Sequence, residues 1–386
     1  MKKRILIDAT TVIEKKDGLS QYIISLLTHL PSSVFELFDI TILINRNVNR
    51  TELLSILDQR KYKYIKASIA PIGPKRDFDL FCFFLKFRNK FDLFHSTSNQ
   101  YPLFLKDGIA TIHDITFRKY LNAKWWTFNF ASRYLSLVIK RSLKNASAII
   151  AVSNFTKQDL IEKFKPSEVI QNKINVIYEG WEHLLVKEDG TEAKISQAYK
   201  SYLFYVGTTR VHKNMKNLLK AFEIAIKQLP DNIQLVISGN ETYLDEADKV
   251  IIDRINKPYQ RIFFTGFVSN AHLQHLFKNA DAFIFPSLSE GFGIPILEAF
   301  YFEKPVLCSN TTSLPEIAGN AALYFDPLIP TSIADSIVLF YSNSAISENL
   351  VQLGKDRLKL FSWKKMANQT VGLYQAILND KNILNN

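Results

Sequence analysis

Short apolar runs alternate with stretches of helical periodicity along the first half of the chain. Residues 4–9 and 38–43 are apolar runs of strand length, and residues 19–27 between them carry apolar side chains at helical spacing. Further strand-like runs follow at residues 91–97, 108–114, 147–152 and 174–178. Strands that alternate with helices predict a doubly wound parallel sheet of the α/β class, whose ligands bind beyond the carboxyl ends of the strands.

The second half shows the same alternation. It contains strand-like runs at residues 202–206, 233–238, 261–268 and 282–286. Residues 215–229 have the periodicity of an amphipathic helix, and Glu179-Gly180 with the charged stretch 187–194 is typical of a linker. Because a chain of 386 residues also favours two domains, we predict one domain over residues 1–185, a second over 186–365 and a final helix over 366–386.

The loop that follows the strand at 282–286 carries informative chemistry. It contains Glu290, Gly291 and Gly293, and Glu298 falls in the predicted first turn of the helix after it. Glycines let backbone N–H groups approach a ligand, and a helix N-terminus attracts phosphate. Two carboxylates can accept hydrogen bonds from sugar or ribose hydroxyls, so this loop suits a nucleotide-sugar. The alternative is an ordinary strand–loop–helix in which Glu298 merely complements the helix dipole.

A second polar loop follows the strand at 202–206. It carries Arg210 and Lys213, and Asn214 is placed to cap the next helix. Two cations and the N–H groups of a helix N-terminus would surround a diphosphate. The alternative is a solvated turn without a ligand.

Three further positions are weaker candidates. His113 stands at the end of a predicted strand, where the alternative is a core or turn histidine held by Asp114. Gly18 precedes the helix at 19–27 and could admit a phosphate, although most such glycines form turns. The backbone of residues 261–268 could hydrogen-bond the edge of a nucleobase, which no side chain would reveal.

The net charge of +11 arises in the first half. Residues 1–185 hold 28 Lys and Arg against 17 Asp and Glu, whereas residues 186–386 hold 20 of each kind. Within the first half, residues 81–91 and 117–145 mix aromatic side chains with cations. This mixture favours peripheral contact with an anionic membrane or a lipid-linked acceptor. The alternatives are a core helix with a solvated basic face and, less favoured, nucleic-acid stacking.

The sequence argues against several other classes of protein. No apolar run approaches the ~18 residues needed to cross a bilayer, and residues 1–10 resemble a first strand, not a signal peptide. Cys82 and Cys308 are far apart in apolar surroundings, as expected of reduced thiols in the cytoplasm. No ligand set for a structural zinc is evident, and we predict no metal.

Several motifs of the second half occur together in one known family. They are Val206-Gly207-Thr208, His212-Lys213-Asn214, Phe264-Thr265-Gly266-Phe267-Val268 and Glu290-Gly291-Phe292-Gly293-Ile294-Pro295 with Glu298-Ala299. By these motifs the chain resembles the family 4 retaining glycosyltransferases of the GT-B fold, especially bacterial mannosyltransferases and rhamnosyltransferases that build surface polysaccharides. The resemblance is dense over residues 202–327 and thinner over 1–185. It implies two Rossmann-like domains facing across a cleft, with the last helix crossing back to the first domain.

The resemblance also implies roles for single residues. Arg210 and Lys213 would bind the diphosphate, Glu290 the donor sugar and Glu298 the ribose, while His113 would lie by the reacting sugar. The remaining positions expected to contact the donor, or in one case the acceptor, are Gly18, Gly207, Phe267, Val268, Gly291, Phe292, Gly293 and Ile294. The chain departs from many family members by carrying Arg210-Val211-His212 in place of Glu-Pro-Arg.

The activity implied by this resemblance is transfer of a hexose, with retention, from a nucleotide-diphosphate sugar to a glycan or lipid-linked acceptor. GDP-mannose is the favoured donor, and no metal or other cofactor is needed because side-chain cations stabilise the departing diphosphate. The expected location is the cytoplasm, at the inner face of the plasma membrane. The alternatives are a GT-B epimerase or phosphorylase, a catalytically silent nucleotide-sugar-binding subunit and a nucleic-acid binder.

Overall fold

The computed structural model describes residues 2–14, 17–49, 51–87, 89–115, 125–185 and 199–384. The chain forms two compact units. Unit 1 comprises Met1–Gly180 and Ser362–Asn386, and unit 2 comprises Trp181–Phe361. The predicted domain edges fall after residues 185 and 365, a few residues beyond these divisions. The predicted linker at 187–194 lies outside the described residues.

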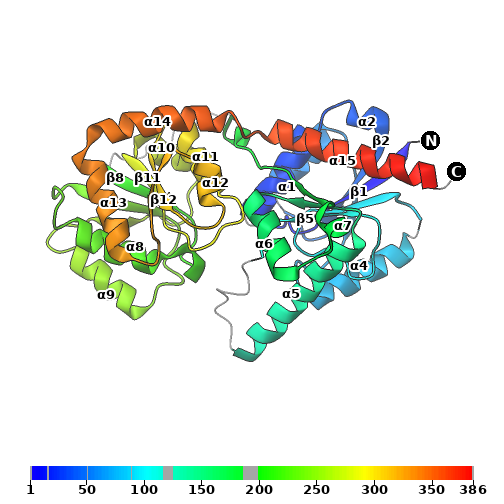
Figure 1. Cartoon of the computed structure of the whole chain (residues 1–386), viewed down its shortest axis with the longest axis horizontal. Coiled ribbons are helices and arrows are strands. Elements are labelled where there is room, and N and C mark those ends of the chain that lie inside the picture. Colours follow the sequence, from blue (N-terminus) through cyan, green and yellow to red (C-terminus); the bar gives the residue numbers. More distant parts are fainter. Residues whose placement is uncertain are drawn as a thin grey trace. The chain divides into compact units, whose positions relative to one another are not determined.

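Unit 1 is built on a parallel sheet with seven described strands in the order β3-β2-β1-β4-β5-β6-β7. The strands are β1 (Lys3–Ala9), β2 (Phe38–Asn45), β3 (Lys63–Ala67), β4 (Leu93–Ser96), β5 (Ile109–Ile112), β6 (Ala148–Ala151) and β7 (Ile174–Val176). The helices are α1 (Gly18–His29), α2 (Val34–Leu37), α3 (Thr51–Gln59), α4 (Pro74–Lys86), α5 (Trp125–Asn145), α6 (Asn154–Phe164), α7 (Glu168–Gln171) and α15 (Trp363–Leu384). Figure 1 shows these helices packed around the sheet.

Unit 2 contains a second parallel sheet, whose described strands have the order β10-β9-β8-β11-β12-β13. They are β8 (Ser201–Val206), β9 (Ile233–Ser238), β10 (Ile262–Phe264), β11 (Ala282–Phe285), β12 (Val306–Ser309) and β13 (Ala322–Phe325). The helices are η2 (Glu182–Leu185), η3 (Val211–Lys213), α8 (Met215–Ala225), α9 (Glu246–Ile255), α10 (Asn270–Asn279), α11 (Ile294–Tyr301), α12 (Leu314–Ala318), α13 (Pro330–Ser342) and α14 (Ser344–Leu358).

The strands are apolar runs because both faces of each sheet are covered. Ile5, Leu6 and Ile7 of β1 are fully buried, although successive side chains of a strand point to opposite faces. In β11, Phe283 and Ile284 are buried in the same way. The predicted fold, two doubly wound parallel sheets, is therefore confirmed.

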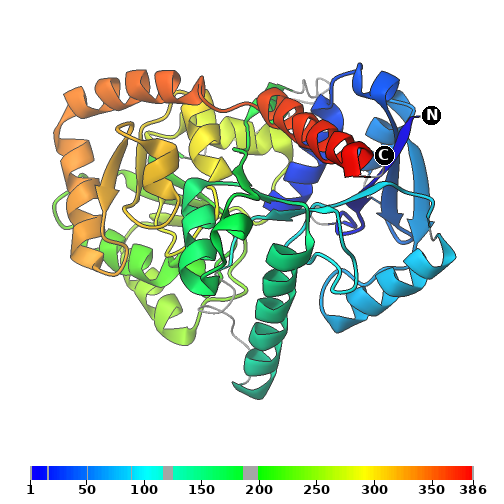
Figure 2. The ribbon, with the colours of Figure 1, turned by 45° about the vertical axis from the view of Figure 1, so that its right-hand side comes forward.

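The last helix belongs to unit 1, although it follows unit 2 in the sequence. Its buried face includes Trp363 and Tyr374. Trp363 packs edge-to-face on Tyr22 of α1 with ring centroids 6.4 Å apart, and the Tyr374 hydroxyl lies 2.7 Å from Nδ1 of His95 in β4. Figure 2 shows α15 in red beside the blue amino-terminal elements. The predicted return of the last helix to the first domain is confirmed.

Two predicted elements are shorter than the sequence pattern suggested. Helix α8 ends at Ala225, not at residue 229. Pro230 disfavours helical backbone at residue 229, so the helix could not have reached the predicted end. Strand β10 ends at Phe264, not at residue 268, because Gly266 adopts a φ of +67°, which turns the chain out of the sheet. Both elements still lie where the periodicity placed them.

The segments predicted to contact a membrane are partly described. Residues 117–124 and Arg88 lie outside the described residues, and α5 begins at Trp125. Among the helices that the structure describes, none is long and apolar enough to cross a bilayer.

Candidate active site

The strand order reverses between β8 and β11 in unit 2. In doubly wound sheets, ligands bind in the crevice beyond the carboxyl ends of the strands at such a reversal. The loop with Arg210 and Lys213 follows β8, and the loop with Glu290 follows β11. The topology therefore brings the two predicted loops to one place.

Lys213 and Glu290 form a close ion pair at this point. Nζ of Lys213 lies 2.6 Å from Oε1 of Glu290, and both side chains are largely buried, with 18% and 15% of their area exposed. The ammonium group also lies 5.3 Å from the centre of the Phe285 ring. A cation and a carboxylate thus stand together at the carboxyl edge, in reach of a ligand that offers both phosphate and hydroxyl groups.

Hydrogen bonds fix the loop that carries Glu290. The backbone N–H of Glu290 donates to Oγ1 of Thr312 at 3.2 Å. The Ser313 hydroxyl donates to the carbonyl oxygens of Glu290 and Phe292 at 3.0 and 2.8 Å. Gly293 has a φ of +112°, and a Cβ there would lie 3.0 Å from Leu314, so this position requires glycine. Helix α11 then begins at Ile294, one residue before Pro295.

Asn214 ties the two loops together. Its side-chain amide donates to the carbonyl oxygen of Pro286, at 3.0 Å, and to that of Pro327, at 2.7 Å. The predicted capping of α8 is wrong, because this side chain makes no cap hydrogen bond and the residue is in the left-handed region, with a φ of 62°. The backbone N–H of Leu288 also donates to the carbonyl oxygen of His212, at 2.8 Å. These bonds set the spacing between Lys213 and Glu290.

Arg210 lies on the same loop but in a more exposed position. Its guanidinium lies 5.7 Å from the centre of the Tyr243 ring. Between the two predicted cations, His212 has a pKa lowered to about 4 by burial and by the charges of Lys213 and Arg210, which outweigh the opposite effect of Glu290. At neutral pH His212 is therefore uncharged, and Arg210 and Lys213 supply the positive charge of the loop.

Glu298 lies in the second turn of α11, not in the first turn as predicted, since the helix begins at Ile294 and has no acidic residue in its first turn. The helix-dipole explanation for this carboxylate is therefore weak. Oε1 of Glu298 lies 3.0 Å from Nε2 of His183, and both side chains are nearly buried. His183, on η2, was not predicted from the sequence.

Two buried hydroxyl groups on this loop and one on the loop after β12 have no hydrogen-bond partner among the residues that the structure describes. Within the part of the chain that the structure describes, the side-chain oxygens of Ser287, Ser289 and Thr311 accept or donate no hydrogen bond. All three follow the carboxyl ends of β11 and β12. Buried polar groups nearly always find a partner, so a polar ligand or ordered water belongs here.

The predicted backbone contacts lie on neighbouring loops of unit 2. Gly207 follows β8 with a φ of +147°, and a Cβ there would meet the hydroxyl of Tyr205 at 2.9 Å. Phe267 is 80% exposed, and Val268 is partly buried beside it, beyond the end of β10. Gly291 and Phe292 lie between Glu290 and α11, with the Phe292 ring buried.

His113 follows β5 at the carboxyl edge of the sheet of unit 1. Its Nδ1 lies 3.3 Å from Oε1 of Glu179, and its Nε2 lies 3.0 Å from the carbonyl oxygen of Thr97. Burial lowers the pKa of His113, but the hydrogen bond and charge of Glu179, with the Thr97 carbonyl, outweigh burial and raise the pKa above its usual value. Glu179, predicted to lie in the linker, is thus part of the histidine site.

Exchanging Glu179 for glutamine should lower the pKa of His113. A raised pKa in the folded state stabilises the fold fully below the unfolded pKa of about 6.5, and the stabilisation is lost as the pH rises through the folded value. Glu179→Gln should remove most of the pH dependence of stability that His113 contributes. The test is to follow the His113 ring signals by NMR against pH, with Glu162→Gln, on the exposed side of α6, as a control. An unchanged His113 titration would contradict the assignment.

Gly18 is the first residue of α1, and space around its α-carbon is open. Asp17 caps this helix, accepting a hydrogen bond from the N–H of Ser20 at 2.8 Å. A carboxylate therefore already occupies the helix N-terminus. In the described ranges of the chain, no cluster of three or more His, Cys, Asp or Glu side chains could hold a metal ion.

Two family models match the chain. The model for Glycosyltransferase Family 4 covers residues 17–182, and the model for Glycosyl transferases group 1 covers residues 189–357. The model ranges correspond closely to units 1 and 2.

Curated relatives and solved structures agree with these models. The chain is 28% identical over 287 residues to O-antigen chain mannosyltransferase B of Escherichia coli, with 74% of each chain covered. It is 29% identical to O-antigen chain mannosyltransferase RfbU of Salmonella typhimurium, with 63% of each covered. The structure of HepE from Anabaena, in complex with UDP and glucose, superposes with a TM-score of 0.73 at 15% identity, over 97% of this chain and 100% of that one. The chain belongs to the family 4 glycosyltransferases of the GT-B fold and is a hexosyltransferase.

Proposed function

We propose that the protein transfers mannose from GDP-mannose, with retention of configuration, to a glycan or lipid-linked acceptor of a bacterial surface polysaccharide. The observation that carries the proposal is the Lys213–Glu290 pair, 2.6 Å apart at the strand-order reversal. The same loop carries Ser287 and Ser289, whose buried hydroxyls have no hydrogen-bond partner in the described part of the chain. The two relatives named above as O-antigen mannosyltransferases support mannose as the sugar.

In this proposal Lys213 serves the leaving group and Glu290 the sugar. The bond from the sugar C1 to the diphosphate oxygen breaks, and the bond from the acceptor oxygen to C1 forms. The diphosphate leaves with the electron pair and takes up the acceptor's proton, so no protein base is required. The ammonium of Lys213 and the guanidinium of Arg210 stabilise the charge that grows on the diphosphate. Glu290 accepts hydrogen bonds from sugar hydroxyls, and His113 of unit 1 serves the reacting sugar.

The nucleotide portion would contact the loops beyond β10 and the start of α11. Glu298 accepts hydrogen bonds from the ribose hydroxyls through the carboxylate oxygen that does not contact Nε2 of His183. The backbone near Phe267 and Val268 bonds the edge of the base. A thermal-shift panel of GDP-, UDP- and dTDP-sugars tests the donor, because a ligand that binds only the folded state raises the melting temperature. A larger rise in melting temperature with UDP-sugars than with GDP-mannose would contradict GDP-mannose as the donor.

Replacing Glu298 with alanine should weaken binding of the nucleotide about tenfold or more, since a charged acceptor for hydroxyl groups contributes roughly 1.5–3 kcal/mol. The matched control is Glu303→Ala, in which an exposed carboxylate just beyond the same helix is removed. Isothermal titration with GDP measures both variants. Equal affinities in the two would remove Glu298 from the donor site.

Side-chain cations make a metal unnecessary in this scheme. Turnover should therefore be the same in EDTA and in magnesium. Product formation from GDP-mannose and a polyprenyl-linked glycan, followed by mass spectrometry, measures it. Loss of activity in EDTA and its return with magnesium would contradict the scheme, and a sugar altered by incubation with donor alone would indicate an epimerase.

We further infer that the protein works in the cytoplasm, in peripheral contact with the inner face of the plasma membrane. The basic first half and the aromatic segments 81–91 and 117–145 support this location. The contact is with lipid and not with nucleic acid. Flotation with anionic vesicles tests it, and binding to RNA or DNA in preference to vesicles would contradict it.

A further inference from the structure

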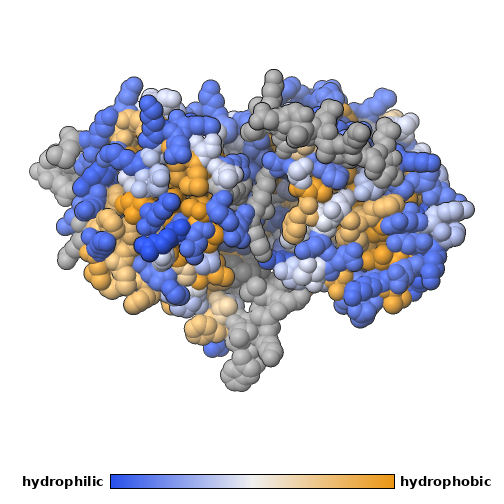
Figure 3. Space-filling model, turned by 180° about the vertical axis from the view of Figure 1, so that it is seen from behind, coloured by the Kyte–Doolittle hydropathy of each residue, from blue (hydrophilic) through white to orange (hydrophobic). Residues whose placement is uncertain are grey.

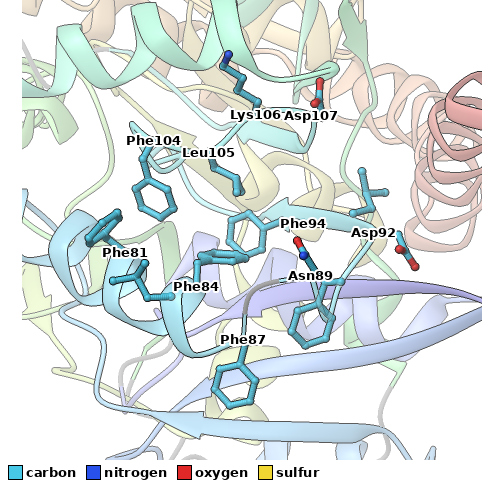
Figure 4. Close-up of a pocket in the computed structure, with 13 residues that line it drawn as sticks. Phe81, Phe84, Phe87, Asn89, Asp92, Phe94, Phe104, Leu105, Lys106 and Asp107 are labelled. Atoms are coloured by element: carbon cyan, nitrogen blue, oxygen red, sulfur yellow. The ribbon is translucent and has the colours of Figure 1, made fainter. Parts of the chain in front are cut away.

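Unit 1 has an aromatic pocket that the proposed reaction does not use. Its volume is about 370 Å³, and its walls come from α4, from Phe87, Asn89 and residues 91–94, and from residues 104–107. Figure 4 shows the rings of Phe81, Phe84, Phe94 and Phe104 turned toward one another. A volume of this size falls at the lower end of the range for small-molecule sites.

The aromatic walls are packed on one side and open on the other. The Phe84 and Phe94 rings are 5.2 Å apart, and the Phe81 and Phe104 rings are 5.3 Å apart. Phe94 is buried, whereas Phe81 and Leu85 are 42% and 61% exposed. The pocket therefore has an aromatic wall and apolar side chains at its entrance, and its remaining lining is polar, with Asn89, Asp92, Lys106 and Asp107.

An exposed apolar stripe on α4 leads into this entrance. Phe78, Phe81 and Leu85 recur at helical spacing, and Phe78 is 65% exposed. Figure 3 shows apolar side chains gathered in patches on the displayed face of unit 1. A contiguous apolar surface next to charged residues is typical of a docking surface.

The rim of the pocket is cationic. Lys86, Lys90 and Lys106 are exposed, and they form no ion pair with any residue that the structure describes. Nζ of Lys86 and Nζ of Lys90 lie 5.8 and 5.3 Å from the centre of the Phe87 ring. The lysines Lys86, Lys90 and Lys106 outnumber the two carboxylates of the lining, Asp92 and Asp107, and Asp92 is also paired with Arg4 at 3.0 Å.

The pocket lies at the edge of the sheet opposite to His113. Residues 91–93 enter β4, and residues 104–107 lead into β5, so both line the amino ends of these strands. His113 follows the carboxyl end of β5. An occupant of the pocket would thus lie on the far side of the sheet from the histidine site.

We propose that this pocket binds one acyl chain of an anionic phospholipid, with the lipid phosphate held by the lysine rim and the α4 stripe entering the membrane interface. The aromatic wall suits the acyl chain, and the lysines suit the phosphate. The bilayer lipid is favoured over the tail of a lipid-linked acceptor because the pocket faces away from His113. The inference rests on the membrane contact proposed above.

Binding of single lipids tests the pocket. Dioctanoyl-phosphatidylglycerol, used below its critical micelle concentration, should raise the melting temperature of the full chain, whereas glycerol phosphate and dioctanoyl-phosphatidylcholine should not. An equal shift in melting temperature with glycerol phosphate would contradict binding of the acyl chain. An equal shift with the choline lipid would contradict recognition of the anionic headgroup by the lysine rim. Stronger binding of farnesyl phosphate than of the glycerol lipid would overturn the phospholipid as occupant.

Matched variants locate the site. Leu85→Asp places a carboxylate at the entrance and should weaken binding of the glycerol lipid at least about tenfold, the loss expected when a few methylene groups lose their apolar surroundings. Val169→Asp adds the same charge at a residue 72% exposed on α7 and should have no effect. Equal affinity of the two variants for the glycerol lipid would contradict binding in this pocket.

A second pair removes charge without touching the apolar walls. Lys86→Gln with Lys90→Gln should weaken the glycerol lipid, whereas Lys66→Gln, at an exposed lysine of β3, should not. Flotation with phosphatidylglycerol vesicles separates the two proposals. If Leu85→Asp leaves both vesicle binding and lipid affinity unchanged, the pocket proposal alone is wrong. If the unmodified protein does not bind vesicles, both the pocket and the proposed membrane contact are wrong. GDP-mannose shifts measured in all variants report on the transferase site independently.

Discussion

Replacing Lys213 with alanine should lower kcat about 10²–10³-fold, the loss seen when one donor to a charge that develops in the transition state is removed. The expectation rests on the position of the ammonium, 2.6 Å from Glu290 on the loop that follows β8. Because the diphosphate gains charge as the bond to the sugar breaks, kcat and kcat/KM should fall together while KM changes little. Steady-state kinetics with GDP-mannose and acceptor provide the measurement.

The control for this variant is Lys216→Ala. Lys216 lies on the next helix, half-exposed and paired with Asp245 at 3.2 Å. Its removal deletes a lysine of the same unit and should leave kcat within about twofold, since exposed ion pairs contribute little. Unchanged turnover in a folded Lys213→Ala protein would remove this lysine from the reaction.

The largest effect on stability is expected for Asp8→Asn. Asp8 and Arg76 are each 1% exposed and form an ion pair in unit 1, where Arg76 also donates to Oγ1 of Thr10 at 2.8 Å. Removing one partner of a buried pair leaves an uncompensated charge and costs about 3–5 kcal/mol. Urea denaturation, compared with the unmodified protein, measures the loss.

Two further variants separate this effect from a general loss of charge. Asp39→Asn breaks the exposed pair with Lys63 and should cost less than about 1 kcal/mol. In the double variant Asp8→Asn, Arg76→Met the orphaned charge is absent, so part of the stability should return. A double variant that is less stable than Asp8→Asn alone would show that the unpaired charge of Arg76 does not cause the loss of stability in Asp8→Asn.

The strands and their order of alternation could be predicted because each strand is a continuous apolar run. Residues 4–9 and 282–286 are examples, and both lie in the interior of their sheets. The ends of elements were less predictable. Gly266 terminates β10 through its backbone angle, which the apolar pattern of residues 262–268 does not reveal.

The candidate site was predicted where the residue itself is the signal. Lys213 and Glu290 stand on loops that follow strands, and the strand order then brings these loops together. His183 and Glu179 were missed because their roles arise from partners 115 and 66 residues away in the sequence. No local pattern marks such a residue, since the tertiary structure alone places it beside Glu298 or His113.

The position of α15 has a consequence for synthesis of the protein on the ribosome. Trp363 and Tyr374 complete the packing around Tyr22 and His95. Unit 1 therefore lacks its last helix until the whole of unit 2 has been translated. At about 5–20 residues per second, the delay after residue 180 is roughly 10–40 seconds. During that interval Tyr22 and His95 lack the contacts that Trp363 and Tyr374 make with them in the complete fold.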